Sequence, residues 1–243
     1  EYRNYIYLGK MDYLYDKVET YDHLKAVIQG RALPDELSNI QHKNADISKH
    51  MMHFLDNHDE QRLASEAFAG SGENGKPLMV VSATISKSPV MIYFGQEVGE
   101  AGTIDGGFGK PTRTSIFDYV GVPNHQRWMN DGKFDGALLD KETKALRDFY
   151  AKLLNTINRS SAISSGKFYD LQYVNRHHLS EGFNEKYLYA YIRYNEKERV
   201  IVIANFNKEE SYEICLKVPE DALSLMKCDE QTTFNFYDIL NEE

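Results

Sequence analysis

The sequence is poor in cysteine, with only Cys215 and Cys228 among its 243 residues. These two residues form no CxxC pair and have no metal-ligand spacing, so we interpret both as free or buried thiols. The sequence also lacks an apolar run long enough to cross a membrane, and we therefore predict no membrane partner.

Basic residues are fewer than acidic ones. The chain has 28 Lys and Arg and 37 Asp and Glu, which gives a formal net charge of -9. A nucleic-acid backbone would be repelled on average, so we predict no nucleic-acid partner. Tryptophan is also scarce, with one residue, whereas the chain has 17 Tyr and 12 Phe. Tyrosine offers an apolar face and a hydroxyl group, which suits packing in the core as well as sugar binding.

The first part of the chain alternates strand-like and helix-like segments. Short apolar runs at 51–55 and 90–94 are typical of buried parallel strands, and a shorter strand is expected at 11–15. The clearest helix is predicted at 140–158, where six large apolar residues share one face. Other expected segments are helices at 21–29 and 78–86, a helix start at 61–69, an irregular stretch at 30–48, and a long loop at 99–136.

After residue 158 the sequence pattern changes. Residues 159–166 are rich in serine and predict a linker. Strand-like segments separated by polar turns then predict an antiparallel β-module of hairpins. These expected strands are residues 168–174, 187–194, 199–206, 211–218 and 232–240.

Polar side chains follow the strand at 51–55 directly, in the run Asp56-Asn57-His58-Asp59. A carboxylate, an imidazole and an amide at the end of a parallel strand are typical of the catalytic face of a β/α barrel. A polar cap that merely ends the strand would have the same composition. From these residues alone, both interpretations stay open.

Asn57-His58-Asp59 resembles the fourth conserved motif of the α-amylase family, glycoside hydrolase family 13. The segment 88–99 resembles the strand-eight motif of that family, and the segment 187–206, ending in Asn205-Phe206, resembles its C-terminal β-domain. The resemblance implies an α/β fold. Residues 1–158 would form the C-terminal part of a TIM (β/α)8 barrel, and residues 159–243 would form an antiparallel β-sandwich.

The same resemblance implies roles for individual residues. Asp59 would be the carboxylate that stabilises the transition state. His58 and Asn57 would belong to the substrate-binding residues, His58 through sugar hydroxyls and Asn57 by bracing the loop. Arg113 resembles an arginine of the strand-eight loop that contributes to substrate binding. The partner implied is an α-glucan oligosaccharide or polysaccharide, and the enzyme would retain anomeric configuration.

The family's nucleophile and acid/base motifs do not occur in this sequence. Because retaining glycosidases need both carboxylates, we expect the chain to be inactive alone. We predict no cofactor from this chain. The family often binds calcium, but through residues that would lie upstream of Glu1.

Two alternatives remain open: a transglycosylase of the same family, and a non-catalytic module that binds α-glucans or has a structural role. Part of a barrel would also expose its interior face and its edges. We therefore expect either a homo-oligomer or a complementary N-terminal half as a partner. The side chains expected to face water are Phe54, Val90, Ile92 and Phe94.

Weaker signals have ordinary explanations. Residues 70–76 match most of a phosphate-binding loop, but Pro77 stands where Ser or Thr would ligate magnesium, so a turn between helices is favoured. Residues of the loop at 99–136 could contact outer sugars, although ordinary packing is favoured for each of them. These residues are Asp105, Phe108, Phe117, Tyr119 and Trp128.

Overall fold

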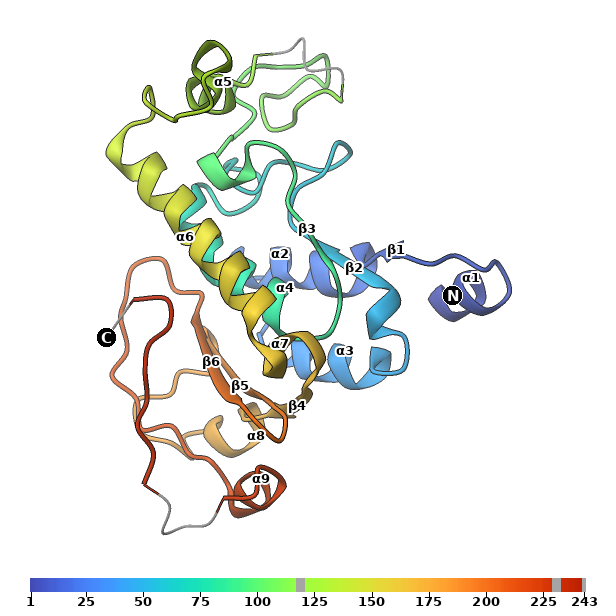
Figure 1. The fold of residues 1–243 in the computed structure, drawn as a ribbon, viewed down its shortest axis with the longest axis vertical. Coiled ribbons are helices and arrows are strands. Elements are labelled where there is room, and N and C mark those ends of the chain that lie inside the picture. Colours follow the sequence, from blue (N-terminus) through green and yellow to red (C-terminus); the bar gives the residue numbers. More distant parts are fainter. Residues whose placement is uncertain (117–120, 229–232, 242–243) are drawn as a thin grey trace.

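The computed structural model describes residues 1–116, 121–228 and 233–241. It contains two three-stranded sheets, one parallel and one antiparallel, with helices around and between them (Figure 1). Helix α4 (Gly72–Thr84) contacts a strand of each sheet and so lies between them. The expected change from a parallel to an antiparallel arrangement along the chain is therefore confirmed.

The parallel sheet has the order β1-β2-β3, with the longest strand in the middle. Its strands are β1 (Leu14–Tyr15), β2 (Met51–Phe54) and β3 (Val90–Met91). The strand expected at 51–55 is confirmed, but those at 11–15 and 90–94 are shorter, because β2 offers hydrogen-bonding partners over only four residues. No further strand pairs with this sheet in the described part of the chain, so a closed barrel is not shown.

The helices before and after β2 differ in part from expectation. The expected helix at 21–29 is present as a short π-helical turn followed by α2, but the stretch at 30–48, expected to be irregular, contains α3. The reason is the spacing of Leu37 and Ile40, which places two buried apolar residues one helical turn apart. The elements are η1 (Lys17–Tyr21), α2 (Asp22–Ile28), α3 (Glu36–Asn44) and η2 (Ser48–His50).

The expected helix start at 61–69 is wrong, because these residues form consecutive turns. Helix α4 begins at Gly72, six residues before the expected start, with the Ser71 hydroxyl accepting a hydrogen bond from the Asn74 amide at 3.1 Å. Pro77 lies inside α4 rather than before it. Residues 70–76 thus form a turn and the first helical residues, and no strand leads into them.

The long helix α6 (Lys141–Arg159) confirms the expected helix at 140–158, and its buried face contains Leu146, Tyr150 and Leu153. The loop at 99–136 is not wholly irregular, because it contains a helix after Pro123. The expected linker contains a short helix instead. The elements near α6 are η3 (Gln96–Val98), α5 (Pro123–Met129), η4 (Asn130–Gly132) and α7 (Ser161–Ser165).

The antiparallel sheet has the order β4-β5-β6 and confirms three of the five expected strands. Residues 211–218 form no strand, because their hydrogen bonds go to single groups such as the Glu181 carbonyl and the Asn175 side chain. In the described part of 232–240 there is no strand either, so a second sheet of the expected sandwich is absent from the described residues. The elements are β4 (Lys167–Asp170), α8 (Gln172–Asn175), β5 (Leu188–Tyr194), β6 (Arg199–Asn205) and α9 (Glu220–Leu225).

One hydrophobic cluster joins both parts of the chain. Tyr189 and Tyr191 of β5 are fully buried in it, and their hydroxyls hydrogen-bond to Ser38 of α3 at 2.9 Å and to Thr84 of α4 at 2.6 Å. Phe54 belongs to the same cluster and is only 2% exposed, which corrects the expectation that it faces water. The ring of Tyr21 stacks on Phe54 with centroids 4.8 Å apart and covers it. Three other side chains expected to face water are half-buried: Val90, Ile92 and Phe94.

Candidate functional site

The candidate site lies at the carboxyl ends of the parallel strands. β1 is followed by Asp16, and β2 is followed by Leu55 and then by the run Asp56-Asn57-His58-Asp59. Adjacent parallel strands end at the same edge of a sheet, so these polar groups gather there. The two buried carboxylates that directly follow β1 and β2, those of Asp16 and Asp56, are bound within the chain.

Asp16 is buried and fixes the end of β1. Its carboxylate accepts hydrogen bonds from the amide and hydroxyl of Thr20 at 3.1 and 2.6 Å and lies 3.4 Å from Nε2 of His53. Burial acts to raise the pKa of Asp16, but the hydrogen bond and charge of His53, together with Thr20, outweigh it and lower the pKa. The other nitrogen of His53 contacts the Ser82 carbonyl at 2.6 Å, so this pair connects β1, β2 and α4.

Asn57 is buried and shapes the loop that follows β2. Its Oδ1 accepts hydrogen bonds from the amides of Asp59 at 2.8 Å and Glu60 at 2.9 Å. This is an Asx turn, in which a side-chain carbonyl replaces a backbone partner. These two hydrogen bonds hold the backbone that carries His58 and Asp59, which is the geometry expected of a residue that braces the loop.

His58 and Asp59 are the members of this loop that face solvent. Their side chains are 41% and 71% exposed, and Nε2 of His58 lies 3.3 Å from Oδ2 of Asp59. An exposed carboxylate beside an imidazole provides acceptors and a donor suited to hydroxyl groups. The sequence predicted these two residues as neighbours in a site, and the structure brings them together at the edge of the sheet.

The far end of the loop is fixed by cations from the preceding helices. Glu60 lies 3.4 Å from Lys17 Nζ and accepts a hydrogen bond from the Tyr21 hydroxyl at 3.3 Å. Lys25 donates to the Gln61 side chain at 2.5 Å. Glu60 and Gln61 thus hold the loop in its shape, whereas the side chains of His58 and Asp59 remain accessible to a ligand.

Beneath the loop lies an ion pair that no sequence motif indicates. Nε of Arg62 is 3.3 Å from Oδ2 of Asp56, and both side chains are fully buried. The other carboxylate oxygen of Asp56 accepts a hydrogen bond from the Leu63 amide. Burial raises the pKa of Asp56 to about 6, although Arg62 and the Leu63 amide act in the opposite direction.

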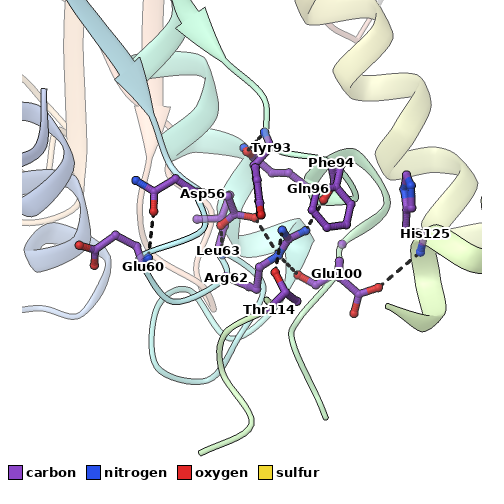
Figure 2. Close-up of polar contacts among 12 residues, drawn as sticks. Asp56, Glu60, Arg62, Leu63, Tyr93, Phe94, Gln96, Glu100, Thr114 and His125 are labelled. Carbon is purple, nitrogen blue, oxygen red and sulfur yellow. Dashed lines mark hydrogen bonds and ion pairs between the residues drawn. The ribbon is translucent and has the colours of Figure 1, made fainter. Parts of the chain in front are cut away.

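Arg62 also connects this loop to the segment after β3 (Figure 2). Its guanidinium donates to the carbonyls of Phe94 at 2.7 Å and Glu100 at 3.2 Å. Gly95, at a φ of +81°, lets the backbone approach closely, since a Cβ there would lie 3.1 Å from Nη2 of Arg62. The carboxylate of Glu100 accepts hydrogen bonds from the amides of Asn124 and His125 and so holds the start of α5.

Arg113 lies beside the same loop. Its Nη2 donates to the His58 carbonyl at 3.5 Å, and its guanidinium lies over the ring of Phe108, 4.2 Å from the centroid. The structure therefore brings Arg113 and His58 together, through the backbone of His58 rather than its imidazole.

Asp105 and Trp128 of the long loop are engaged in local contacts. Asp105 accepts hydrogen bonds from three successive amides, those of Gly107, Phe108 and Gly109. The ring of Trp128 packs against His125 and Phe134. Phe117 and Tyr119, also considered for sugar contacts, lie outside the described residues.

A groove of about 680 Å³ lies elsewhere, on the side of the antiparallel sheet. It shares no residue with the loop after β2. Its lining includes Leu33, Ser180, Phe183, Asn184, Lys186 and Tyr212.

Neither a metal centre nor a membrane span is visible in what the structure describes. No three His, Cys, Asp or Glu side chains within the described ranges are grouped to hold a metal ion. Within the same ranges, no helix is both long and apolar enough to cross a bilayer.

The fold is similar to part of several solved enzymes. A noncanonical maltogenic α-amylase, AmyB, from Thermotoga neapolitana is 16% identical over 83% of this chain and 39% of that protein, with a TM-score of 0.53. An α-amylase from H. orenii is 18% identical over 80% of this chain and 39% of that protein, with a TM-score of 0.53. A debranching enzyme from Nostoc punctiforme is 15% identical over 80% of this chain and 37% of that protein, with a TM-score of 0.51.

The chain thus spans about 39% of the length of the first two of these enzymes. No protein-family profile and no curated protein matches the sequence. At these identities the similarity concerns the fold.

Proposed function

We propose that this chain is the C-terminal part of a retaining α-glucan hydrolase of the α-amylase family, and that it contributes sugar-binding groups to the catalytic centre. In this proposal Asp59 stabilises the transition state, His58 binds sugar hydroxyls, and Arg113 contacts the substrate beside them. Residues 1–158 belong to the barrel and residues 159–243 to the C-terminal module. No cofactor is assigned to this chain.

One observation carries the proposal: an exposed Asp59–His58 pair stands on a braced loop at the carboxyl edge of a parallel sheet. The similarity in fold to named α-amylases supports it, because the Asn57-His58-Asp59 motif occurs on this fold. Contacts to sugar hydroxyls next to the cleaved bond strengthen as positive charge develops on the ring. A carboxylate held there would therefore favour the transition state over the bound substrate.

The remaining acidic groups at this edge suggest binding rather than cleavage by the chain alone. Asp16, Asp56 and Glu100 are buried and bonded to other groups of the chain. A retaining glycosidase needs a nucleophile and an acid/base about 5 Å apart on either side of the bond. Asp59 alone cannot perform both steps, and this observation favours the non-catalytic, sugar-binding role for the isolated chain.

A binding titration tests the proposal. The chain is titrated with maltoheptaose by calorimetry or NMR, and the same is done for Asp59→Asn and His58→Gln. We expect weak binding by the unaltered chain, with affinity about tenfold lower or more after either change, because a charge-assisted hydrogen bond to a hydroxyl is lost. Asp148→Asn is the matched control, since Asp148 is exposed on α6, away from the loop after β2.

Two results would overturn the proposal. One is the absence of any maltoheptaose binding at millimolar concentrations. The other is binding that Asp59→Asn and Asp148→Asn weaken equally, which would place the sugar elsewhere on the chain.

A further inference from the structure

The loop after β2 is closed at its base by two buried side chains. Asp56 stands where the loop begins, and Arg62 and Leu63 stand where it ends. The Asp56 carboxylate binds both ends together, through the Leu63 amide and the Arg62 guanidinium. The exposed residues of the site therefore lie within a ring closed by one hydrogen bond and one ion pair.

The same arginine fixes a second segment next to the loop. Its backbone amide donates to the Thr112 carbonyl at 2.8 Å, and its guanidinium reaches the Thr114 hydroxyl at 3.5 Å. Arg113 lies between these two threonines and contacts the His58 carbonyl. Figure 2 shows Arg62 between Asp56, Phe94, Glu100 and Thr114.

We infer that the buried Asp56–Arg62 pair is a positioning device for the sugar-binding groups, holding the loop of His58 and Asp59 and the segment of Arg113 in one fixed arrangement. This inference rests on the proposed function. Neither side chain is exposed, so neither touches the sugar. Both act through the backbone that carries the exposed residues. Loss of the pair loosens the loop and moves Arg113 at the same time.

The electrostatic surroundings make this device sensitive to pH. Burial raises the pKa of Asp56 to about 6, and the negative charges of Glu97 and Glu100 add to that effect, while Arg62 opposes it. The hydroxyls of Tyr21 and Tyr150 also interact with this carboxylate. Because the closed, buried arrangement raises this pKa, it binds the proton more readily than an opened, hydrated loop does, so opening of the loop becomes more costly as pH falls through about 6 and less costly as pH rises.

The first experiment measures the loop without any sugar. Hydrogen exchange at the amides of Asp59 and Glu60, which are bonded to Asn57, reports whether the loop keeps its shape. We expect about tenfold faster exchange or more in Asp56→Asn and in Arg62→Lys. Asp56→Asn keeps the shape of the side chain and an oxygen for the Leu63 amide, so it remains informative if Arg62→Lys fails to fold.

Arg193→Lys is the matched control. Arg193 is also buried and donates to three carbonyls, those of Ile85, Ile163 and Gly166, away from the loop. We expect this change to lower global stability and to leave exchange of the two loop amides unaltered once that stability is taken into account. Unaltered loop exchange in both Asp56→Asn and Arg62→Lys would overturn the inference.

The second experiment follows exchange of the same amides, and maltoheptaose affinity, from pH 4.5 to 8. We expect both to change with a midpoint near pH 6, and the midpoint in exchange to disappear in Asp56→Asn but to persist in His58→Gln. A midpoint that follows His58 instead would refute the role of Asp56. If the wild-type chain shows the loop transition but binds no maltoheptaose, the proposed function is wrong. If the wild-type chain binds maltoheptaose and the substitutions at Asp56 and Arg62 leave loop exchange unchanged, only the positioning role is wrong.

Discussion

Asp56 and Asp59 carry the same side chain but meet opposite surroundings, although only two residues separate them. Asp56 is fully buried against Arg62, whereas Asp59 is 71% exposed beside His58. Burial disfavours a charge and solvent favours it, so the two carboxylates have different tasks in one loop. Asp56 determines the loop's shape, and Asp59 is the group that a ligand meets.

The first residue-scale prediction concerns stability and pH. The pKa of Asp56 is raised in the folded chain to about 6, from an ordinary value of 3.8. Between these two values the folded state binds the proton more readily than the unfolded state, so this group's contribution to stability falls as pH rises through that window. We expect the unfolding free energy of the unaltered chain, relative to Asp56→Asn, to fall by about 1–3 kcal/mol between pH 4 and pH 7.

Urea unfolding of both proteins at several pH values measures this difference. Comparing the two cancels the contributions of the other titrating groups. Parallel pH profiles for the two proteins would show that Asp56 does not titrate in this range.

The second residue-scale prediction concerns catalysis in an active enzyme that contains this chain. Asp59→Asn should lower kcat much more than it weakens substrate binding, because the contact strengthens in the transition state. The loss corresponds to about 3–4 kcal/mol, as for other preorganised transition-state contacts. Steady-state kinetics with a maltooligosaccharide test it, and a raised KM with near-normal kcat would contradict the assigned role.

The sequence revealed the exposed half of this site better than the buried half. Asn57, His58 and Asp59 follow a buried strand directly, so their pattern was recognisable. Arg62 is not recognisable in the sequence because, apart from Asp56, its partners Phe94, Glu100 and Thr114 are more than 30 residues distant in the chain. A buried charge becomes recognisable only when the fold brings its partners to it.

At the scale of elements, the spacing of apolar residues correctly predicted the helices and strands that have a continuous buried face. Helix α6 and strands β5 and β6 appeared where their apolar spacing indicated. Short elements were harder, since α3 has only two buried apolar residues and residues 61–69 are shaped by tertiary contacts rather than by helix propensity. Pairing decides the length of β3, and pairing is not a local property.

The element-scale prediction concerns the start of α6. Asp140 caps this helix by accepting a hydrogen bond from the Thr143 amide at 2.8 Å. Asp140→Ala should therefore lower the unfolding free energy by about 1 kcal/mol. Urea or thermal unfolding measures it, with Asp148→Ala on the exposed face of the same helix as the control. Equal effects of the two substitutions would mean that the cap does not stabilise α6 measurably.

The described residues place one exposed carboxylate, that of Asp59, at the proposed centre, and the chain spans about 39% of the length of two solved α-amylases. We therefore predict that the isolated chain releases no reducing sugar from starch, maltooligosaccharides or pullulan. A colorimetric reducing-end assay tests this. Steady release in proportion to the chain's concentration, retained after repurification, would contradict the prediction and require a second carboxylate within this chain.

The last prediction concerns what covers the outer side of β1. Exposed apolar side chains gather along the chain on both sides of this strand, which is an edge strand in the described sheet. Met11, Tyr13 and Val18 are 52%, 61% and 68% exposed. An edge strand beside such a surface offers unpaired backbone groups and apolar area together, a combination that favours association. The other exposed members are Tyr5, Tyr7, Leu8 and Tyr15.

We expect the chain to form a dimer or larger oligomer through this surface, or to bind a complementary N-terminal half of the barrel when one is supplied. Light scattering and sedimentation at low micromolar concentration measure the association. The double substitution Met11→Lys and Tyr13→Lys should weaken it, because two charges would be buried at the contact. Leu225→Lys, on an equally exposed residue of α9, should leave it unaltered. If the chain is a cooperatively unfolding monomer that does not bind the complementary half, β1 is stable as an open edge strand.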